Sequence, residues 1–315
     1  MMISTLVSQP IVVPGMRSIS THRWKQILFI VVFVSICFLV FHSIRIAHLA
    51  QLANHGIGQA QYRKEPNSPL KEQKIPKIIH QIWKDNDLST YSIKASREEW
   101  IKRYPDFEVR LWTENEIRDL IKEKYEWLWN LYMGYSYNIQ RADVARYVVL
   151  YDQGGIYADL DCFPKDDLGP ILDAEVGLVS TLDGKGVSNH FMLAEKNSPF
   201  LLKVLSNLQN HDIFILIPYL RVFYSTGPLF LTIQLADYSK PMDLLLTQQV
   251  GNKYNIHKAG RSWHGIDGFI GNWVADNKEE FKVIFYGLLC TAVLITLLIV
   301  YVQRRRRRRY KRINV

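Results

Sequence analysis

Hydrophobic and polar positions follow two different periods along the middle of the chain. Alternating or short apolar runs predict strands at 78–83, 108–112, 156–160 and 176–180. Helical spacing of apolar residues predicts helices at 92–103, 113–123 and 139–152. Thr113, with Glu116 three residues later, has the spacing of a helix capping box. Because strands and helices alternate, the pattern predicts an α/β domain with a mostly parallel sheet, in which ligands lie at the carboxyl ends of the strands.

Two longer apolar segments flank this region, at 26–44 and 283–302. The second carries no charge over 20 residues, and a helix rising about 1.5 Å per residue would cross a hydrocarbon core of roughly 30 Å. We expect a transmembrane helix there, since a buried core helix seldom lacks a polar face. For the first segment we expect an uncleaved signal anchor rather than a cleaved signal peptide, because no small-x-small cleavage site follows it.

Basic residues lie on the outer side of both apolar segments. Arg17, Arg23 and Lys25 precede the first, and eight of the last twelve residues are Arg or Lys. The positive-inside rule therefore places both ends of the chain in the cytosol and the region between the segments in the lumen. The terminal arginine run would fix this topology, bind anionic lipid or be read by sorting machinery.

The net charge of +9 comes from the ends of the chain. Once the 12 basic residues around the apolar segments are set aside, 27 basic and 30 acidic residues remain between them. A strongly basic face is the electrostatic footprint of a nucleic-acid-binding domain. The middle region has no such excess, so we expect no nucleic-acid partner.

The tripeptide Asp159-Leu160-Asp161 closes the predicted strand 156–160. Alternate residues of a strand point to the same side, so the two carboxylates would converge on one ion. Hard cations such as Mn²⁺ or Mg²⁺ take oxygen ligands and bridge carboxylate to phosphate. This suits a diphosphate leaving group, although the tripeptide alone also fits a solvated strand end.

The residues before this tripeptide add a second polar group. Asp143 and Arg146 are three residues apart, so they share one face of the predicted helix. An arginine there would contact phosphate, and an aspartate would bind ribose or sugar hydroxyls. Gly154 and Gly155 permit a tight turn from helix to strand and the close approach of a ligand.

The stretch from Arg141 to Asp161 closely resembles the signature of family 32 of the glycosyltransferases, those with the DXD sugar-binding region. Residues 75–84 (IPKIIHQIWK) resemble the opening strand of this family, and residues 100–115 (WIKRYPDFEVRLWTEN) resemble its second unit. The three motifs stand in the family's order, and the resemblance extends more weakly to about residue 275. It implies a GT-A-like nucleotide-sugar-binding domain.

The resemblance also implies roles for individual residues. Catalytic roles would fall to Asp159, Asp161 and Arg146. Donor-site residues would be Trp83, Asp143, Arg146, Gly155, Tyr157 and Asp159. The metal ligands would be Asp159, Asp161 and His264, the last within Arg261-Ser-Trp-His264. Outside the family context, Trp83 reads as a core aromatic and His264 as a structural histidine. Ser225-Thr-Gly-Pro228 resembles a family loop near the donor sugar or is an ordinary turn.

Within the family, the chain most resembles the inositol phosphoceramide mannosyltransferases. This implies a retaining enzyme that uses Mn²⁺ or Mg²⁺ and transfers mannose from GDP-mannose to inositol phosphoceramide. It also implies a Golgi or endoplasmic reticulum membrane location and a multispanning regulatory subunit as partner. Two spans would hold the active site close to a lipid acceptor and raise its effective concentration. The alternative within the family is a mannosyltransferase that acts on a protein-linked glycan.

The resulting division of the chain has six parts. These are a cytosolic segment, a signal anchor, a stem, a lumenal catalytic domain, a transmembrane helix and a cytosolic tail, at 1–25, 26–44, 45–74, 75–282, 283–302 and 303–315. Two functions from other classes fit the sequence less well. A phosphatase of the haloacid-dehalogenase type normally has Thr or Val where this chain has Phe163, and a non-catalytic membrane subunit would not need intact Asp159 and Asp161.

Overall fold

The computed structural model describes residues 62–63, 73–89, 95–174, 176–180, 186–212, 215, 217–238, 244–246 and 254–258, with isolated residues between 266 and 305. The chain divides into two compact units, Met1–Leu52 and Ala53–Val315. The first unit lies outside the described residues, so the fold below is that of the second.

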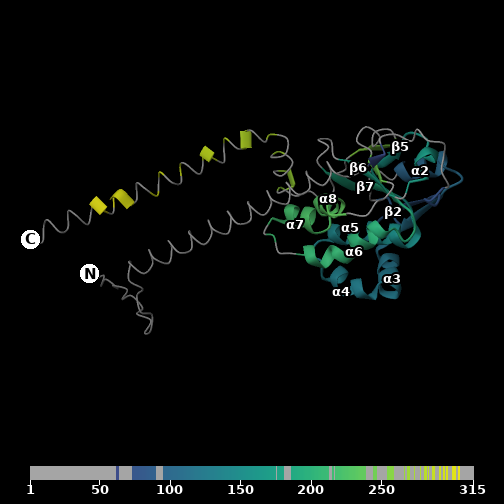
Figure 1. Cartoon of the computed structure of the whole chain (residues 1–315), viewed down its shortest axis with the longest axis horizontal. Helices are drawn as coiled ribbons and strands as arrows, with labels where there is room; N and C mark the ends of the chain where they lie inside the picture. The colour runs from purple at the N-terminus through teal and green to yellow at the C-terminus, as the bar shows by residue number, and fades with distance from the viewer. Residues whose placement is uncertain are drawn as a thin grey trace, which may run out of the picture. The chain divides into compact units, whose positions relative to one another are not determined.

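A seven-stranded sheet forms the centre of the second unit, in the order β1-β8-β6-β7-β4-β2-β3 (Figure 1). The strands are β1 (Tyr62–Arg63), β2 (Ile78–Ile82), β3 (Glu108–Trp112), β4 (Gly155–Ala158), β6 (Val176–Ser180), β7 (Val187–Ala194) and β8 (Leu244–Leu246). Only β7 runs antiparallel to its neighbours, β4 and β6, and the other four pairs are parallel. The prediction of an α/β domain with a mostly parallel sheet is confirmed, and the sheet is mixed.

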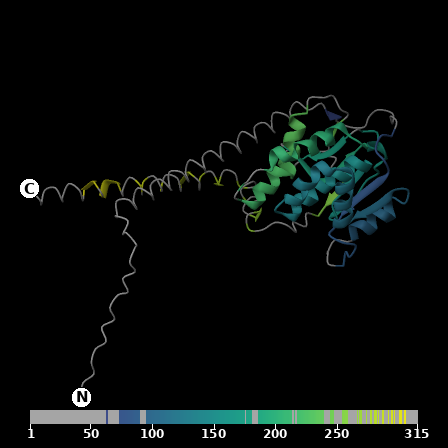
Figure 2. The same cartoon turned by 90° about the horizontal axis from the view of Figure 1, so that it is seen from below.

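Helices cover one face of this sheet, and a smaller layer covers the other (Figure 2). On the first face α5 (Asn138–Gln153) and α8 (Pro228–Ala236) pack against the strands. The helices packed around these two are α3 (Glu114–Lys124), α4 (Glu126–Gly134), α6 (Pro199–His211) and α7 (Pro218–Ser225). The other face carries α2 (Ala95–Arg103), a 3₁₀ turn (Gly169–Ile171) and a two-stranded antiparallel sheet of β5 (Cys162–Pro164) and β9 (Asn255–His257).

Two apolar clusters, one on each face, explain the layering. Along β4, Tyr157 belongs to the cluster under α5, whereas Ile156 and Ala158 belong to the cluster under α2. This is the alternation expected of a strand buried on both faces. The strand ends at Ala158, so the predicted strand 156–160 is two residues too long and Asp159 to Asp161 form a turn between β4 and β5.

The capping box predicted at Thr113 is confirmed. The Thr113 hydroxyl accepts a hydrogen bond from the Glu116 N–H (3.3 Å), and the Glu116 carboxylate accepts one from the Thr113 N–H (2.7 Å). These bonds satisfy backbone donors that the first turn of α3 leaves without helical partners. The strands predicted at 78–83 and 108–112 are confirmed as β2 and β3 within one residue.

Glycine is required at the turn from α5 to β4 by close packing. Gly154 and Gly155 have φ of 69° and 101°, a region that side chains rarely occupy. A Cβ on Gly155 would lie 2.6 Å from the Ile78 carbonyl oxygen of β2. This packing explains why the position requires glycine, and the role of Gly155 in the donor site stays a prediction.

The predicted membrane and stem segments fall largely outside the described residues. Segment 26–44 lies wholly outside them, and 283–302 is described only at isolated positions. Within the part of the chain that the structure describes, no helix combines the length and apolarity needed to cross a bilayer. Tyr62 and Arg63, which belong to the predicted stem, instead pair with β8 at the edge of the sheet.

Candidate active site

The turn after β4 is held in place by main-chain hydrogen bonds to β7 and β9. The Asp159 N–H donates to the His190 carbonyl (2.9 Å), and the Lys258 N–H donates to the Asp161 carbonyl (2.9 Å). The Cys162 N–H closes the turn on the Asp159 carbonyl (2.9 Å). Both carboxylates therefore sit on a backbone that three strands fix at the carboxyl end of β4.

Arg146 connects α5 to this turn. Its Nη2 lies 3.0 Å from Asp159 Oδ1, and its Nη1 lies 2.5 Å from Asp143 Oδ1. The guanidinium also lies 5.3 Å from the centre of the Tyr157 ring, within the range of a cation–π contact. One buried cation is thus shared by two carboxylates and an aromatic ring, an arrangement that uses the planar fork of arginine.

Asp159 has a second partner on β4. The Tyr157 hydroxyl donates a hydrogen bond to Asp159 Oδ1 at 2.5 Å, so this oxygen is bound from two sides. Tyr157 is itself buried in the core under α5. Its ring therefore supports Arg146, while its hydroxyl orients the first carboxylate of the tripeptide.

Asp143 is surrounded by donors from three elements. Oδ1 accepts from Arg146 and from Asn189 Nδ2 of β7 (2.8 Å), and Oδ2 accepts from Thr226 Oγ1 (2.9 Å) at the junction of α7 and α8. Asn189 also donates to the Tyr147 hydroxyl (3.3 Å), which in turn donates to the Thr226 carbonyl (2.7 Å). Both carboxylate oxygens of Asp143 are thus engaged in positioning the arginine.

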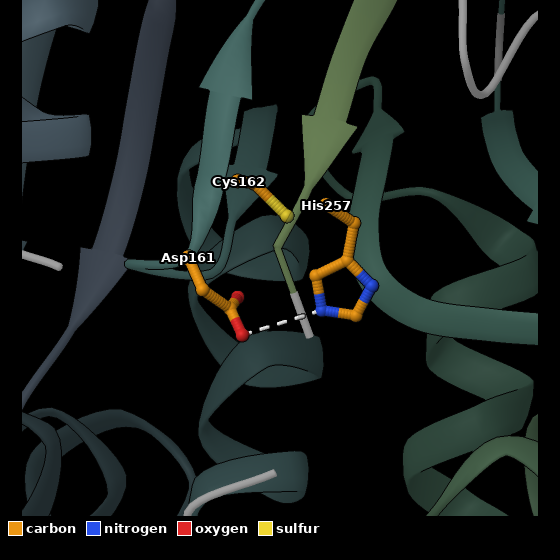
Figure 3. A group of neighbouring side chains, drawn as sticks. All are labelled: Asp161, Cys162 and His257. Carbon is orange, nitrogen blue, oxygen red and sulfur yellow. Dashed lines mark ion pairs between the residues drawn. The ribbon is translucent and has the colours of Figure 1, made fainter. Parts of the chain in front are cut away.

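The Asp161 carboxylate lies beside β9. Its Oδ2 lies 3.3 Å from His257 Nε2 (Figure 3). The His257 ring stacks on the His190 ring, with centroids 4.1 Å apart and planes 10° apart. The two carboxylates of the tripeptide therefore have separate surroundings, one around a buried arginine and the other beside a pair of histidines.

The donor set around Asp161 fits a metal ion. One atom each of Asp161, Cys162 and His257 lie within 4.8 Å of one another. Within the described residues Asp159 is not part of this group, because its carboxylate faces Arg146 and Tyr157. A carboxylate beside an imidazole can hold a divalent ion that also takes oxygens from a ligand.

Burial and charge shift the pKa of these groups in opposite directions. Burial raises the pKa of Asp143 to about 6, against the attraction of Arg146. Burial also raises the pKa of Asp159, although Arg146 opposes the shift. Burial works against the charge on Arg146, but Asp159, Tyr157 and Asp143 raise its pKa well above the ordinary value. Arg146 therefore remains a cation throughout the working pH range of an enzyme.

The pKa values of the two histidines shift in opposite directions. Burial, followed by repulsion from His257, lowers the pKa of His190 to about 3, so His190 is neutral. His257 loses some basicity through burial, but its hydrogen bond and attraction to Asp161 raise its pKa overall. A proton or a metal ion on His257 would therefore be stabilised by the neighbouring carboxylate.

The structure brings together most of the residues predicted from the sequence. Asp143, Arg146, Tyr157 and Asp159 form one connected cluster, and Asp161 lies on the same turn. Trp83 follows β2, and its N–H donates to the Trp112 carbonyl (3.0 Å). Because β2 and β4 are parallel neighbours, Trp83 lies at the same edge of the sheet as the tripeptide. His264 lies outside the described residues, so its role as a metal ligand stays a prediction.

Three further residues belong to the site, and sequence reasoning predicted none of them individually. Asn189, Thr226 and His257 reach the cluster through pairings of β7 and β9 and through the packing of α8. Thr226 lies in the Ser225–Pro228 stretch, whose resemblance to a family loop was the one available signal. Nothing in local spacing marks Asn189 or His257, because tertiary contacts alone place them.

Comparisons with known proteins agree with this site. The family model "Glycosyltransferase sugar-binding region containing DXD motif" matches residues 91–178. Inositol phosphoceramide mannosyltransferase 1 of Schizosaccharomyces pombe is 33% identical over 240 residues, which cover 71% of this chain and 73% of that protein. Mannosyl phosphorylinositol ceramide synthase SUR1 of Saccharomyces cerevisiae is 39% identical over 209 residues, which cover 63% of this chain and 54% of that protein.

Among solved structures, PaToxG Glycosyltransferase matches with a TM-score of 0.38 and 20% identity, covering 64% of this chain and 79% of that chain. The sequence match is the stronger of the two results. It spans nearly three quarters of the first relative and little more than half of the second. This chain belongs to the family of glycosyltransferases whose sugar-binding region contains a DXD motif.

Proposed function

We propose that this chain transfers mannose from GDP-mannose to inositol phosphoceramide, with retention of the anomeric configuration and with the help of a divalent metal ion. The observation that carries the proposal is the Arg146 cluster at the carboxyl end of β4, in which one buried cation is paired with Asp159 beside Asp161. The names of the two relatives support the acceptor and the sugar.

Asp161 and His257 would hold the metal ion, which would be Mn²⁺ or Mg²⁺. When bound, such an ion neutralises charge that builds on a leaving diphosphate. Asp161 is well placed for this role, because its main chain is fixed by Lys258 and its carboxylate faces the histidine side of the turn. Asp159 would face the ribose or the sugar, since Arg146 and Tyr157 turn it away from the metal group.

Arg146 would stabilise the leaving nucleoside diphosphate from the other side. Its side chain is only 10% exposed, and a cation in such a dry setting interacts more strongly with developing charge than it would in water. The cost of burying it is offset by Asp159 and Asp143. Asn189 and Thr226 hold Asp143 in turn, so the guanidinium needs little reorganisation when the donor binds.

The acceptor and the cellular setting extend the proposal. A lipid headgroup at the bilayer surface would reach a domain anchored by segments 26–44 and 283–302, in a Golgi or endoplasmic reticulum membrane. A multispanning regulatory subunit would act as a partner. The anchoring rests on the apolar and basic segments of the sequence, and the lipid acceptor on the names of the relatives. The membrane location and the regulatory subunit rest on the family resemblance alone.

The test is transfer of labelled mannose from GDP-mannose to inositol phosphoceramide, in membranes that contain the full chain and a candidate regulatory subunit. A chelator should abolish transfer, and Mn²⁺ should restore it. Asp161→Asn should abolish transfer, whereas the matched control Asp237→Asn should not, because Asp237 is exposed and bridges only to Lys203 among the described residues.

Three results would discriminate the proposal from its alternatives. A mannosylated lipid that requires both metal and Asp161 supports it in full. Transfer to a protein-linked glycan but not to the lipid would overturn the acceptor. Metal-independent transfer would overturn the role of Asp161 and His257 while leaving the donor intact.

A further inference from the structure

We propose that Asp161, Cys162 and His257 also bind a thiophilic divalent ion of the Zn²⁺ class, which competes with the harder ion used for sugar transfer. Figure 3 shows the three side chains converging from the turn after β4 and from β9. This inference concerns the ligand chemistry of the site and does not depend on which sugar or acceptor the chain uses.

Strand pairing creates the cluster. Cys162 is the first residue of β5 and stands opposite His257 of β9 in the antiparallel register. Asp161 immediately precedes it, with its carboxylate 3.3 Å from His257 Nε2. Ligand atoms around a tetrahedral zinc ion lie roughly 3.3–3.8 Å apart, given metal–ligand bonds of about 2.0–2.3 Å. The three ligand atoms here all lie within 4.8 Å of one another, so no pair needs to close by more than about 1–1.5 Å.

Two of the three ligands are held in orientation by their neighbours. The His257 imidazole stacks on His190, whose Nδ1 lies 2.6 Å from Ser188 Oγ. Cys162 is fully buried in the apolar cluster under α2, whose packing restricts its side chain, and its thiol donates to the His190 carbonyl (3.6 Å), a contact that metal binding would replace. Such outer contacts fix the directions of metal ligands and so reduce the cost of forming the site.

The donor types favour a softer ion than Mg²⁺. One carboxylate, one imidazole and one thiolate form a set that zinc accepts, whereas Mg²⁺ takes almost only oxygen ligands and gains nothing from sulfur. Binding exchanges the thiol proton of Cys162 for a sulfur–metal bond, and that proton leaves to solvent. Three protein ligands leave a fourth position for water or a ligand oxygen.

Competition follows because Asp161 cannot serve both ions. An ion drawn toward the Cys162 sulfur occupies the carboxylate that the hard ion needs beside the diphosphate. His257, with a side chain 34% exposed, is the most open of the three ligands and lies where an ion would enter. The cluster thus makes the site sensitive to free Zn²⁺ as well as dependent on Mn²⁺ or Mg²⁺.

Cobalt provides a direct test of the sulfur ligand. Purified full-length chain in detergent, without nucleotide sugar, is titrated with Co²⁺ as a spectroscopic substitute for Zn²⁺. We expect a thiolate-to-cobalt charge-transfer band in the near ultraviolet that is lost in Cys162→Ser. The band should persist in the double variant Cys37→Ser/Cys290→Ser, which removes the other two cysteines of the chain. No band in the wild type, or a band that survives in Cys162→Ser, would overturn the proposal.

Displacement of Mn²⁺ provides a second test. Bound Mn²⁺ is followed by electron paramagnetic resonance while Zn²⁺ is added to wild type, Cys162→Ser and Cys162→Ala. We expect both variants to need at least about tenfold more Zn²⁺ for half-displacement, because Zn²⁺ loses its sulfur ligand whereas Mn²⁺ keeps Asp161 and His257. Cys162→Ala keeps the test valid if Cys162→Ser folds poorly. Equal displacement in all three proteins would overturn the proposal, and neither readout requires sugar transfer.

Discussion

Arg146 and Asp159 form an ion pair of 3.0 Å that joins helix α5 to the turn after strand β4. The pair connects the two polar motifs of the sequence, and Arg146 is buried while Asp159 is partly buried. Removing one member of such a pair leaves the other charge without a partner in a poorly solvated site. The resulting loss of stability is larger than the net stability that the intact pair contributes. The first predictions below concern this pair and its supports.

Replacing Arg146 with lysine should nearly abolish sugar transfer. A lysine ammonium cannot span Asp143 and Asp159 with two separate N–H groups in one plane, so one carboxylate loses its partner. We expect kcat to fall by about 100-fold or more. The measurement is mannose transfer at saturating donor. Arg118→Lys is the matched control, because Arg118 pairs with Glu114 on the partly exposed surface of α3. An Arg146→Lys variant with near-normal kcat would contradict the assigned role.

Replacing Tyr157 with phenylalanine should weaken use of the donor while preserving the fold. The ring under Arg146 stays, but Asp159 loses its 2.5 Å hydrogen bond. A hydrogen bond to a charged group contributes about 1.5–3 kcal/mol, so kcat/KM for the donor should fall by about 10- to 100-fold. Steady-state kinetics with varied nucleotide sugar will measure this. The control is Tyr104→Phe, because the Tyr104 hydroxyl donates to the Asp166 carbonyl and does not contact the Arg146 cluster. Equal kinetics for wild type and Tyr157→Phe would show that the hydroxyl is dispensable.

Replacing Thr226 with valine should reduce activity through Asp143. The variant keeps the shape of the side chain but leaves Asp143 Oδ2 buried without its donor, at a cost of about 1–3 kcal/mol in unfolding free energy. Thr232→Val is the matched control, since Thr232 is a buried threonine of α8 that bonds to Val187 and Pro228 instead. We expect both variants to lower the melting temperature, and only Thr226→Val to lower kcat/KM of the folded protein. A similar loss of activity in both would point to general destabilisation.

Acid should unfold the domain partly through His80. This buried side chain contacts the Gly154 carbonyl through Nε2 (2.8 Å) and accepts from Trp112 Nε1 (3.0 Å), so it is held neutral. Burial lowers its pKa from 6.5 to about 4. The unfolded chain therefore binds the proton first, and stability that is complete above pH 6.5 is lost as the pH falls toward 4. The loss amounts to about 3 kcal/mol from this residue.

Denaturant unfolding of the purified chain between pH 7 and 4 will measure this loss. His80→Gln can retain both hydrogen bonds but does not titrate, so its stability should depend less on pH across the same interval. His211→Gln serves as the control, because His211 is a partly exposed histidine at the end of α6. If His80→Gln and wild type show the same slope of stability against pH, the titrating group lies elsewhere.

Local elements could be predicted from the sequence because their signals are local. The capping box at Thr113, the strand at Ile78 and the pairing of Asp143 with Arg146 on one helical face all depend on spacings of a few residues. The glycine pair after α5 was also recognisable as a tight turn, in agreement with the positive φ of both residues. Close packing against Ile78 explains Gly155, and no sequence pattern shows which strand will lie beside it.

Long-range relations could not be predicted in the same way. Strand β7 runs antiparallel between β4 and β6, and this placement depends on tertiary packing. The position of β7 brings Asn189 within hydrogen-bond distance of Asp143. The convergence of Asp159 and Asp161 on one ion stays a prediction. The strand ends at Ala158, which the sequence pattern did not show, and in the turn that follows Asp159 contacts Arg146 while Asp161 lies beside His257.

The two-stranded sheet of β5 and β9 ties the tripeptide to a segment near the end of the folded domain. His257 is 96 residues beyond Asp161, so the loop between them must close before the second carboxylate gains its neighbour. Contacts between residues so far apart in sequence form late in folding, because the entropy of closing the loop is lost before the contact contributes any stability. During synthesis, a chain that already contains the whole stretch from Arg141 to Asp161 would still lack a complete catalytic centre. The ion-binding side of the centre would be completed only when nearly all of the domain had left the ribosome.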